Sequence, residues 1–201
     1  MTEHTTITRG QLAQLIDDTL LEPEVTDDDV ARLAKQAEQL SVHAICISPS
    51  RLPLAPGVLA GGIGVVAVAG FPSGAHLASV KVAEAAAAVS AGATEVDMLI
   101  DLGLAMDDRW KPVTAEVAAV RAAIGPQVTL KVIIETAVIG PGRRRHRAGG
   151  RRDSRRGRRP ARGEGGRGIH TTEQALAMIA ADATRIGASH TAAILNGVHD
   201  E

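Results

Sequence analysis

VTLKVIIET, residues 128–136, is a run of apolar and β-branched residues around one lysine, and this composition predicts a buried β-strand. TEVDMLID, residues 94–101, has a similar character further upstream, and residues 112–124 between the two predict a helix. A strand, a helix and a second strand of these lengths are typical of a βαβ unit. The two strands are therefore expected to lie side by side in a parallel sheet.

The same alternation extends along the chain on both sides. Helices are predicted over residues 8–16, 26–40, 76–91, 170–183 and 191–197, and strands over 43–49, 64–71 and 185–189, with a short strand or turn at 17–24. Repeated units of this kind favour an α/β fold of the (β/α)8 TIM-barrel type. The alternative is an open doubly wound sheet, although no GxGxxG follows a strand and opens a helix, which disfavours its dinucleotide-binding form.

Residues 141–168 interrupt this pattern. They contain 12 Arg against Asp153 and Glu164, and no Val, Ile, Leu, Met, Phe or Trp. This Arg/Gly-rich segment has a net charge of +10, whereas the rest of the chain has −11. Because a buried parallel strand needs apolar side chains, the segment cannot supply one. We expect a single, incomplete barrel domain over residues 1–201, in which a disordered insert replaces strands six and seven and leaves strands five and eight with unpaired edges.

Three hypotheses explain the Arg/Gly-rich segment. In a GC-rich gene, Ala and Gly codons read one base out of frame become Arg, Gly and Pro codons, so two compensating frame changes would produce it. Sequencing the coding DNA across codons 138–172 tests this hypothesis, because an intact reading frame would reject it. Nucleic-acid binding is disfavoured, since the segment lacks aromatic residues for base stacking and the body is acidic. A solvated loop of this length is uncommon inside a compact domain.

The composition of the chain predicts its cellular compartment and the type of core and cofactors that it has. Aromatic residues make up 1% of the chain, so the core must consist of small aliphatic residues. The single cysteine, Cys46, excludes an internal disulfide and indicates a reducing compartment. The polar start and the lack of a membrane-length apolar run predict a cytoplasmic protein with no membrane contact. The seven histidines have no zinc-binding spacing, so neither a metal nor another cofactor is expected.

Charged residues on the two central strands indicate a site. Alternation places Glu95, Asp97 and Asp101 on one face of the first strand and Lys131 on one face of the second. Because consecutive strands are usually neighbours, Asp97 and Lys131 are expected to form an inward-facing charged pair. Buried ionisable groups that lie close together shift each other's pKa values and often mark a functional site. A structural ion pair that fills the barrel agrees equally well with the strand geometry.

Four other residues are candidates: Asp17, Cys46, Gly187 and Ser189. Asp17 could face the cavity, but a lone acidic residue more often caps a helix or turn. Cys46 is more often a small buried hydrophobic residue than a nucleophile. Gly187 and Ser189 lie where a predicted strand passes into a short helix, and N–H groups at a helix N-terminus can bind phosphate.

Several segments together resemble one family. IDDTLLEPE (16–24), AICISPS (44–50), VAGFPSGAH (68–76) and TLKVIIETAV (129–138) are similar in order and spacing to deoxyribose-phosphate aldolases. The resemblance covers residues 12–140 and resumes over 168–195. It implies a barrel fold and a class I aldolase that cleaves 2-deoxy-D-ribose 5-phosphate to glyceraldehyde 3-phosphate and acetaldehyde. The positions that match the family's site residues are Asp17, Cys46, Asp97, Lys131, Gly187 and Ser189.

The resemblance also implies a chemical role for some of these positions. In the family, a lysine forms a Schiff base with the substrate carbonyl carbon, and a second lysine lowers the pKa of the first. An aspartate at the position of Asp97 helps to shuttle protons, and residues at Gly187 and Ser189 bind phosphate. The implied partner is therefore a phosphosugar substrate, and a homodimer is a candidate assembly.

The sequence departs from the family where the Schiff base forms. The KTSTG-like motif of strand six and the KASGG-like motif of strand seven are absent, and the chain's four lysines are Lys35, Lys81, Lys111 and Lys131. Lys131 matches a strand-five lysine that is placed differently relative to the substrate. We therefore expect a lyase of the aldolase family with little or no activity. The alternative is a non-catalytic protein whose Arg-rich segment binds nucleic acid.

Overall fold

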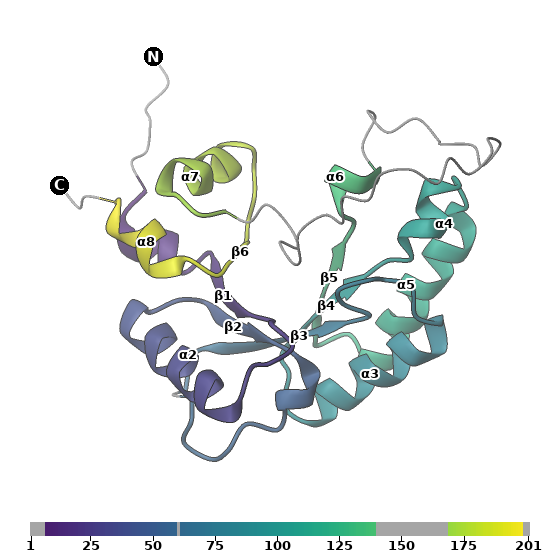
Figure 1. Ribbon diagram of the computed structural model, residues 1–201, viewed down its shortest axis with the longest axis horizontal. Coiled ribbons are helices and arrows are strands. Elements are labelled where there is room, and N and C mark those ends of the chain that lie inside the picture. Colours follow the sequence, from purple (N-terminus) through teal and green to yellow (C-terminus); the bar gives the residue numbers. More distant parts are fainter. Residues whose placement is uncertain (1–6, 60, 140–168, 199–201) are drawn as a thin grey trace, which may run out of the picture.

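The computed structural model describes residues 7–59, 61–139 and 169–198, and within them all paired strands run parallel in one sheet. The order across the sheet is β5-β4-β3-β2-β1-β6, so the last strand pairs with the first (Figure 1). The strands are β1 Ile16–Leu20, β2 Ala44–Ile47, β3 Gly64–Ala69, β4 Glu95–Leu99, β5 Thr129–Ile133 and β6 Ile186–Ala188. This order is that of a barrel with a gap between β5 and β6.

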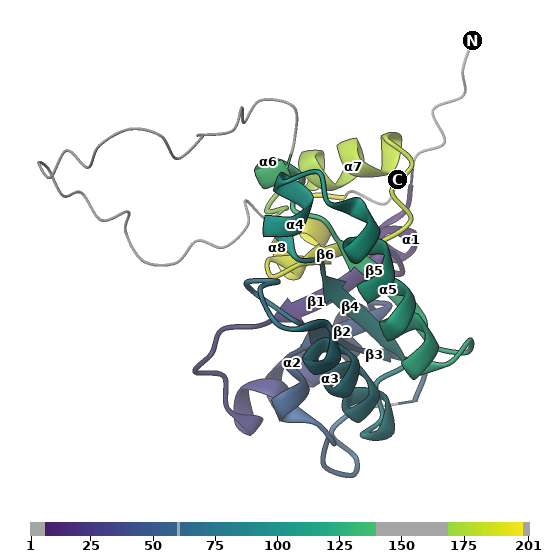
Figure 2. The same cartoon turned by 90° about the vertical axis from the view of Figure 1, so that its right-hand side faces the viewer.

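Helices surround the sheet, and the three longest lie outside its curve (Figures 1 and 2). They are α2 Asp27–Leu40, α3 Ala78–Ser90 and α5 Trp110–Ile124. The shorter elements are α1 Arg9–Ala13, the 3-10 helix η1 Pro49–Arg51, α4 Leu102–Met106, α6 Thr136–Ile139, α7 Thr172–Ala180 and α8 Thr191–Asn196. The predicted α/β fold, an incomplete (β/α)8 barrel, is confirmed by this curled parallel sheet.

Side-chain alternation divides the core into two layers. Outward-facing residues such as Ile45 and Met98 pack in the apolar clusters between the sheet and the helices. On the inner face, Ala44, Cys46 and Val66 form a smaller apolar cluster with Val68. The inner face of the sheet is therefore partly apolar over β2 and β3, and its charged residues come from the other strands.

Side-chain capping explains where several helices begin. The Thr26 hydroxyl accepts a hydrogen bond from the Asp29 backbone N–H, and α2 then runs to Leu40 as predicted. Thr8 caps α1 in the same way, but the helix ends at Ala13, so Ile16 belongs to β1 and not to the predicted helix. The short helices α4 and α6 were not predicted, because four or five residues give too little periodicity.

Exposed apolar side chains lie on the edge strand β5 and on helix α7. Val132 on β5 is 38% exposed and Ile134 just after it is 43% exposed, while Leu176 and Met178 on α7 are 38% and 42% exposed. Edge strands with unpaired backbone groups and apolar neighbours favour self-association. The predicted insert at 141–168, its disorder and its nucleic-acid binding lie outside the described residues. Among the described residues, no helix has the length and apolar content needed to cross a membrane.

Candidate active site

Six charged or titratable residues meet on the inner face of the sheet. Lys131 on β5 places its Nζ atom 2.6 Å from Asp17 Oδ2, 3.0 Å from Glu95 Oε2 and 3.2 Å from Asp97 Oδ1. Arg185, just before β6, donates hydrogen bonds of 3.1 Å to both Asp17 and Glu95. His43 Nε2 lies 3.2 Å from Glu95 Oε1. We call this set the inner charged cluster: Asp17, His43, Glu95, Asp97, Lys131 and Arg185.

The curvature of the sheet assembles this cluster. Asp97 and Lys131 are register partners on the adjacent strands β4 and β5, so their contact needs no curvature. Asp17, however, lies on β1, which is separated from β5 by three strands in the sheet order. A flat sheet would keep neighbouring strands about 4.8 Å apart and would place Asp17 far from Lys131. The contact across the concave face therefore depends on the barrel-like curl.

The cluster is well shielded from water. Its side chains range from 4% exposed for Asp17 to 31% for His43, and Lys131 is 24% exposed. Asp17, Glu95 and Arg185 lie near the amino ends of their strands, whereas Asp97 and Lys131 lie two residues further along β4 and β5. Barrel enzymes carry out their chemistry toward the carboxyl ends of the strands. The Asp97–Lys131 pair is therefore better placed to contact a substrate than Asp17, Glu95 and Arg185 are.

Burial and charge shift two pKa values in this cluster. Burial raises the pKa of Asp97 to about 6, although the neighbouring Lys131 ammonium opposes this rise. For Lys131, burial acts to lower the pKa, but the carboxylates of Asp97, Asp17 and Glu95 outweigh it. The pKa of Lys131 is therefore raised above the ordinary lysine value, and its side chain is an ammonium at neutral pH.

The protonation of Lys131 decides what it can do chemically. An amine attacks a carbonyl carbon only through a deprotonated nitrogen, and lysine nucleophiles are usually activated by desolvation or a nearby cation. Lys131 is instead within 3.2 Å of three carboxylates, which stabilise the charged form. Asp97, with a pKa of about 6, is mostly ionised at neutral pH and can accept a proton. The geometry thus suits electrostatic binding and proton transfer better than nucleophilic attack.

The other three lysines lie outside the cluster. Lys35 and Lys111 are exposed on α2 and α5. Lys81 is fully buried on α3, where its Nζ lies 2.9 Å from Glu116 Oε2 of α5. Since the chain's four lysines are all among the described residues, Lys131 is the lysine that the fold brings to the inner face.

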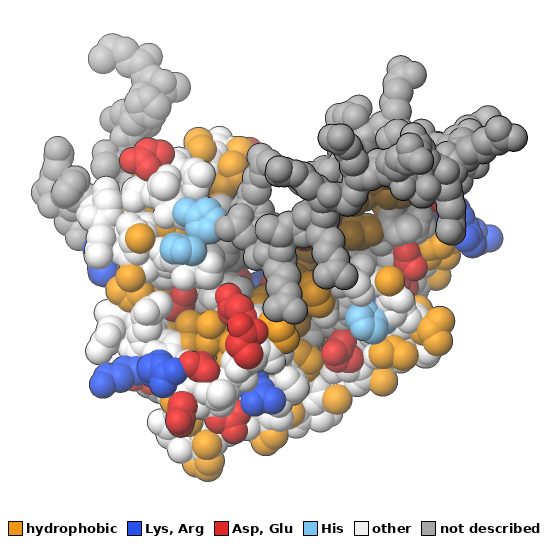
Figure 3. Space-filling model, in the orientation of Figure 1, with side chains coloured by type: hydrophobic (Ala, Val, Ile, Leu, Met, Phe, Trp, Pro, Cys, Tyr) orange, Lys and Arg blue, Asp and Glu red, His pale blue; other side chains and the backbone are white. Residues whose placement is uncertain are grey.

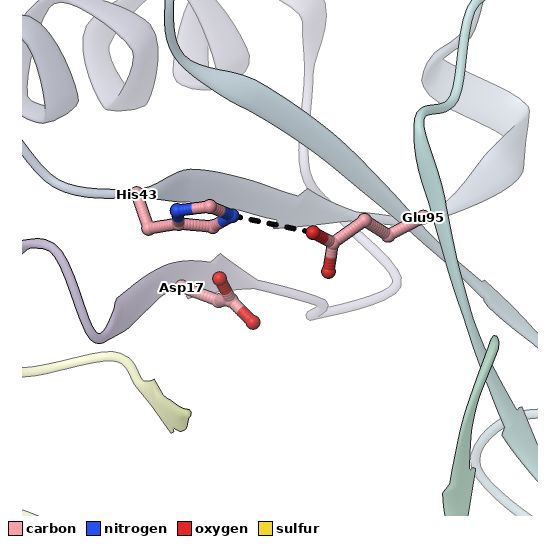
Figure 4. Close-up of side chains that lie close together, drawn as sticks. All are labelled: Asp17, His43 and Glu95. Carbon is pink, nitrogen blue, oxygen red and sulfur yellow. Dashed lines mark hydrogen bonds and ion pairs between the residues drawn. The ribbon is translucent and has the colours of Figure 1, made fainter. Parts of the chain in front are cut away.

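Asp17, His43 and Glu95 also have the donor types of a metal site. Figure 4 shows the His43 ring directed at Glu95 with Asp17 beside it, and their ligand atoms lie within 4.8 Å of one another. Imidazole and carboxylate groups are suitable zinc ligands. Lys131 and Arg185, however, already supply positive charge to these carboxylates, so a cation would have to displace them. The arrangement favours an ion-pair network, and the expectation of no metal here stays a prediction.

Cys46 lies beneath the site as part of the inner apolar layer. It is 3% exposed, and burial raises the pKa of its thiol strongly. A protonated thiol packed against Val66 and Val68 behaves as a small hydrophobic residue, which is the structural interpretation that the sequence favours. Its proposed contact with substrate stays a prediction.

Gly187 and Ser189 lie at the β6 end of the sheet. Gly187 is exposed and is the register partner of Asp17, which places it beside the inner charged cluster. Ser189 is exposed, and its hydroxyl lies 3.2 Å from His190 Nδ1. Both residues therefore border the concave face, and phosphate binding by them stays a prediction.

The sequence analysis predicted three members of the cluster, Asp17, Asp97 and Lys131, and assigned no role to the other three. Glu95 was placed on the correct face with Asp97, but no role was assigned to it. His43 and Arg185 each directly precede a strand, and this position is the sequence feature that could have indicated them as site residues. Asp101, expected on the same face, instead caps α4, because its Oδ1 accepts a hydrogen bond from the Leu104 N–H at 2.9 Å.

Known proteins are similar to this chain over most of its length. A family model described as DeoC/LacD family aldolase matches residues 11–148, which ends inside the Arg/Gly-rich segment. A deoxyribose-phosphate aldolase of Kocuria rhizophila is 43% identical over 219 residues, covering 96% of this chain and 99% of the relative. One from Nocardia farcinica is 44% identical over 224 residues, covering 98% and 99%. These alignments are longer than the chain's 201 residues, so both include positions with no residue of this chain.

A solved structure has the same architecture. A protein from Coccidioides immitis, provisionally identified as a deoxyribose-phosphate aldolase, superimposes with a TM-score of 0.75 at 25% identity. The superposition covers 93% of this chain and 85% of that one.

Proposed function

The chain belongs to the DeoC/LacD aldolase family, and on that premise we propose that its inner face descends from a site that cleaves 2-deoxy-D-ribose 5-phosphate. The proposal has a second part: this chain catalyses the cleavage at a strongly reduced rate or not at all. One observation carries it. Lys131 is the lysine on the inner face, and three carboxylates hold its amine in the protonated form.

A class I aldolase reaction begins with a free amine. The neutral nitrogen attacks the substrate carbonyl carbon, and loss of water then gives an iminium ion. A base takes the substrate hydroxyl proton, the C–C bond breaks and the first aldehyde leaves, while the iminium accepts the electron pair and becomes an enamine. Protonation of the enamine carbon and hydrolysis by water then release the second aldehyde and the free amine. An ammonium at Lys131 has no lone pair for the first step. The chain therefore retains groups that bind and transfer protons, but it has no activated nucleophile on this face.

The remaining groups support binding. Asp97 can exchange protons near neutral pH because its pKa is about 6. Gly187 and Ser189 border the concave face and are the proposed contacts of the substrate phosphate. Enzymes that lose a covalent catalytic residue usually keep a rate above that of the uncatalysed reaction through binding and electrostatic stabilisation. We expect kcat/KM to be lower than that of the Kocuria relative by on the order of 10⁶-fold, the loss that follows removal of a covalent nucleophile.

Borohydride trapping tests this proposal directly. The chain and the Kocuria relative are incubated with 2-deoxy-D-ribose 5-phosphate and sodium borohydride, which reduces an iminium to a stable amine, and the adducts are measured by mass spectrometry. The relative should become labelled, and this chain should not. Labelling that maps to Lys131 and disappears in Lys131→Met, but persists in the surface variant Lys111→Met, would disprove the impaired-site proposal.

A further inference from the structure

Two histidines outside the inner charged cluster lie in direct contact. His170, just before α7, and His190, just before α8, have Nδ1 atoms 2.9 Å apart. Their ring centroids are 4.5 Å apart and the rings are inclined by 74°. Both side chains are exposed, and histidine side chains gather on the face shown in Figure 3. The two residues are 20 positions apart in sequence, so no spacing motif reveals the pair.

We propose that His170 and His190 bind a divalent first-row transition metal, with Cu²⁺ preferred. Neutral imidazole nitrogen is a good ligand for Cu²⁺, Ni²⁺ and Zn²⁺. With metal–nitrogen bonds of about 2.0 Å, two ligands at a right angle are about 2.8 Å apart, and two tetrahedral ligands are about 3.3 Å apart. The observed 2.9 Å is close to the right-angle value, which is the geometry of tetragonal Cu²⁺.

The backbones of both histidines are held in place. The His170 N–H donates to Gln174 Oε1 at 2.8 Å, next to the Thr171 capping box of α7. His190 is the N-cap of α8, and its carbonyl accepts a hydrogen bond from Ile194 N–H at 3.1 Å. The contact between the two Nδ1 atoms is a hydrogen bond, so one ring carries its proton on Nδ1. Transfer of that proton to Nε2 through solvent, together with side-chain rotations, then turns both nitrogens toward one ion. A site built on fixed backbones loses less conformational entropy on binding.

A neighbouring hydroxyl can supply a further ligand. Among the described residues, the two imidazoles make side-chain contacts with each other and with Ser189, whose hydroxyl oxygen lies 3.2 Å from His190 Nδ1. No ion pair with Lys or Arg is formed there within the described residues, in contrast to the carboxylates of the inner charged cluster. Ser189 can donate an oxygen ligand, and water can complete the coordination.

Metal titration of the full-length chain and matched variants tests the site. Cu²⁺ binding is followed by calorimetry and by electron paramagnetic resonance, which detects nitrogen ligands. We expect His170→Gln and His190→Gln each to weaken one binding equivalent by about tenfold or more, since even outer-shell substitutions at metal sites cost 10–100-fold. The exposed His76→Gln variant should bind this equivalent as the unmodified chain does. The unmodified chain should bind Zn²⁺ more weakly than Cu²⁺.

The histidine variants are exposed and should fold normally, which circular dichroism checks. The other histidines of the chain are present in both His170→Gln and His190→Gln, so the loss in these two variants isolates the pair. The proposal is overturned if His170→Gln and His190→Gln bind as the unmodified chain does, or if only one of them has an effect. An equal loss in His76→Gln would show adventitious surface binding and would also overturn it.

Discussion

Asp17 and Asp18 are neighbours in the chain, but their side chains lie on opposite faces of the sheet and have different partners. Asp17 points to the inner face, where its carboxylate contacts the cations Lys131 and Arg185. Asp18 points outward and is 1% exposed, and among the described residues its side chain is hydrogen-bonded to the neutral groups of Gln36 and Thr191, at 2.8 and 2.7 Å. Burial raises the pKa of Asp18 despite these hydrogen bonds.

The same difference applies to the lysines. Lys131 on the inner side contacts three carboxylates, and its side chain is 24% exposed. Lys81 on the outer side is fully buried and contacts Glu116. A shared, partly accessible network can exchange protons and bind a polar ligand. The dry pair, Lys81 and Glu116, is buried away from water and contributes to the packing of α3 against α5. The Lys131 network on the inner face is therefore the candidate for binding and proton transfer, whereas the Lys81–Glu116 pair on the outer face stabilises the fold.

The largest effect is expected from breaking the dry pair. Glu116→Gln leaves the Lys81 ammonium buried without a carboxylate, and the free energy of unfolding should fall by about 3–5 kcal/mol. Urea denaturation measures this loss. The exposed substitution Glu24→Gln is the matched control, with a change within about 0.5 kcal/mol. A loss below about 1 kcal/mol for Glu116→Gln would contradict the assignment of a dry structural pair.

A pH-dependent effect is expected on the inner face. The pKa of Asp97 is about 6 in the folded protein and near 3.8 when unfolded, so the folded state binds the proton more tightly. Stability from this group is full below about pH 4 and is lost as the pH rises through 6. Relative to Asp97→Asn, the unmodified chain should therefore lose about 2–3 kcal/mol between pH 4 and pH 7. Parallel stability curves for the two proteins would rule out a raised pKa.

A smaller effect should follow from Thr191→Val. The fully buried Thr191 hydroxyl donates to Asp18 Oδ1 at 2.7 Å, and valine has nearly the same volume without the donor. Loss of a hydrogen bond to a buried carboxyl should cost about 1.5–3 kcal/mol at pH 7. Chemical denaturation of the variant and the unmodified chain measures this cost. A loss below about 0.5 kcal/mol would show that the fold does not depend on the hydrogen bond between Thr191 and Asp18.

The smallest effect is expected for Lys111→Met. Lys111 is exposed near the start of α5, where a positive charge opposes the helix dipole. Its removal should change the free energy of unfolding by less than about 0.5 kcal/mol, with a slight gain. Thermal denaturation of this variant gives the baseline for the lysine comparison. A clear loss of stability would indicate a contact for Lys111 in solution.

Much of this fold could be predicted because apolar periodicity is local. The strands at 95–99 and 129–133 and the helix at 27–40 follow from patterns within a dozen residues and from the Thr26 cap. The pairing of Asp97 with Lys131 needed only one further step, the adjacency of consecutive strands. The ends of strands and the short helices were missed, since few local contacts determine them.

The sequence alone determined the alternating βαβ order, the inward face of Asp97 and Lys131, and the absence of an apolar run in residues 141–168. Tertiary structure decided that Asp17, Glu95 and Arg185 join Lys131 and keep its amine protonated. The physical reason is distance. Strand alternation depends on the nearest residues, whereas the charge state of Lys131 depends on carboxylates that the curvature of the sheet brings together from strands far apart in the chain.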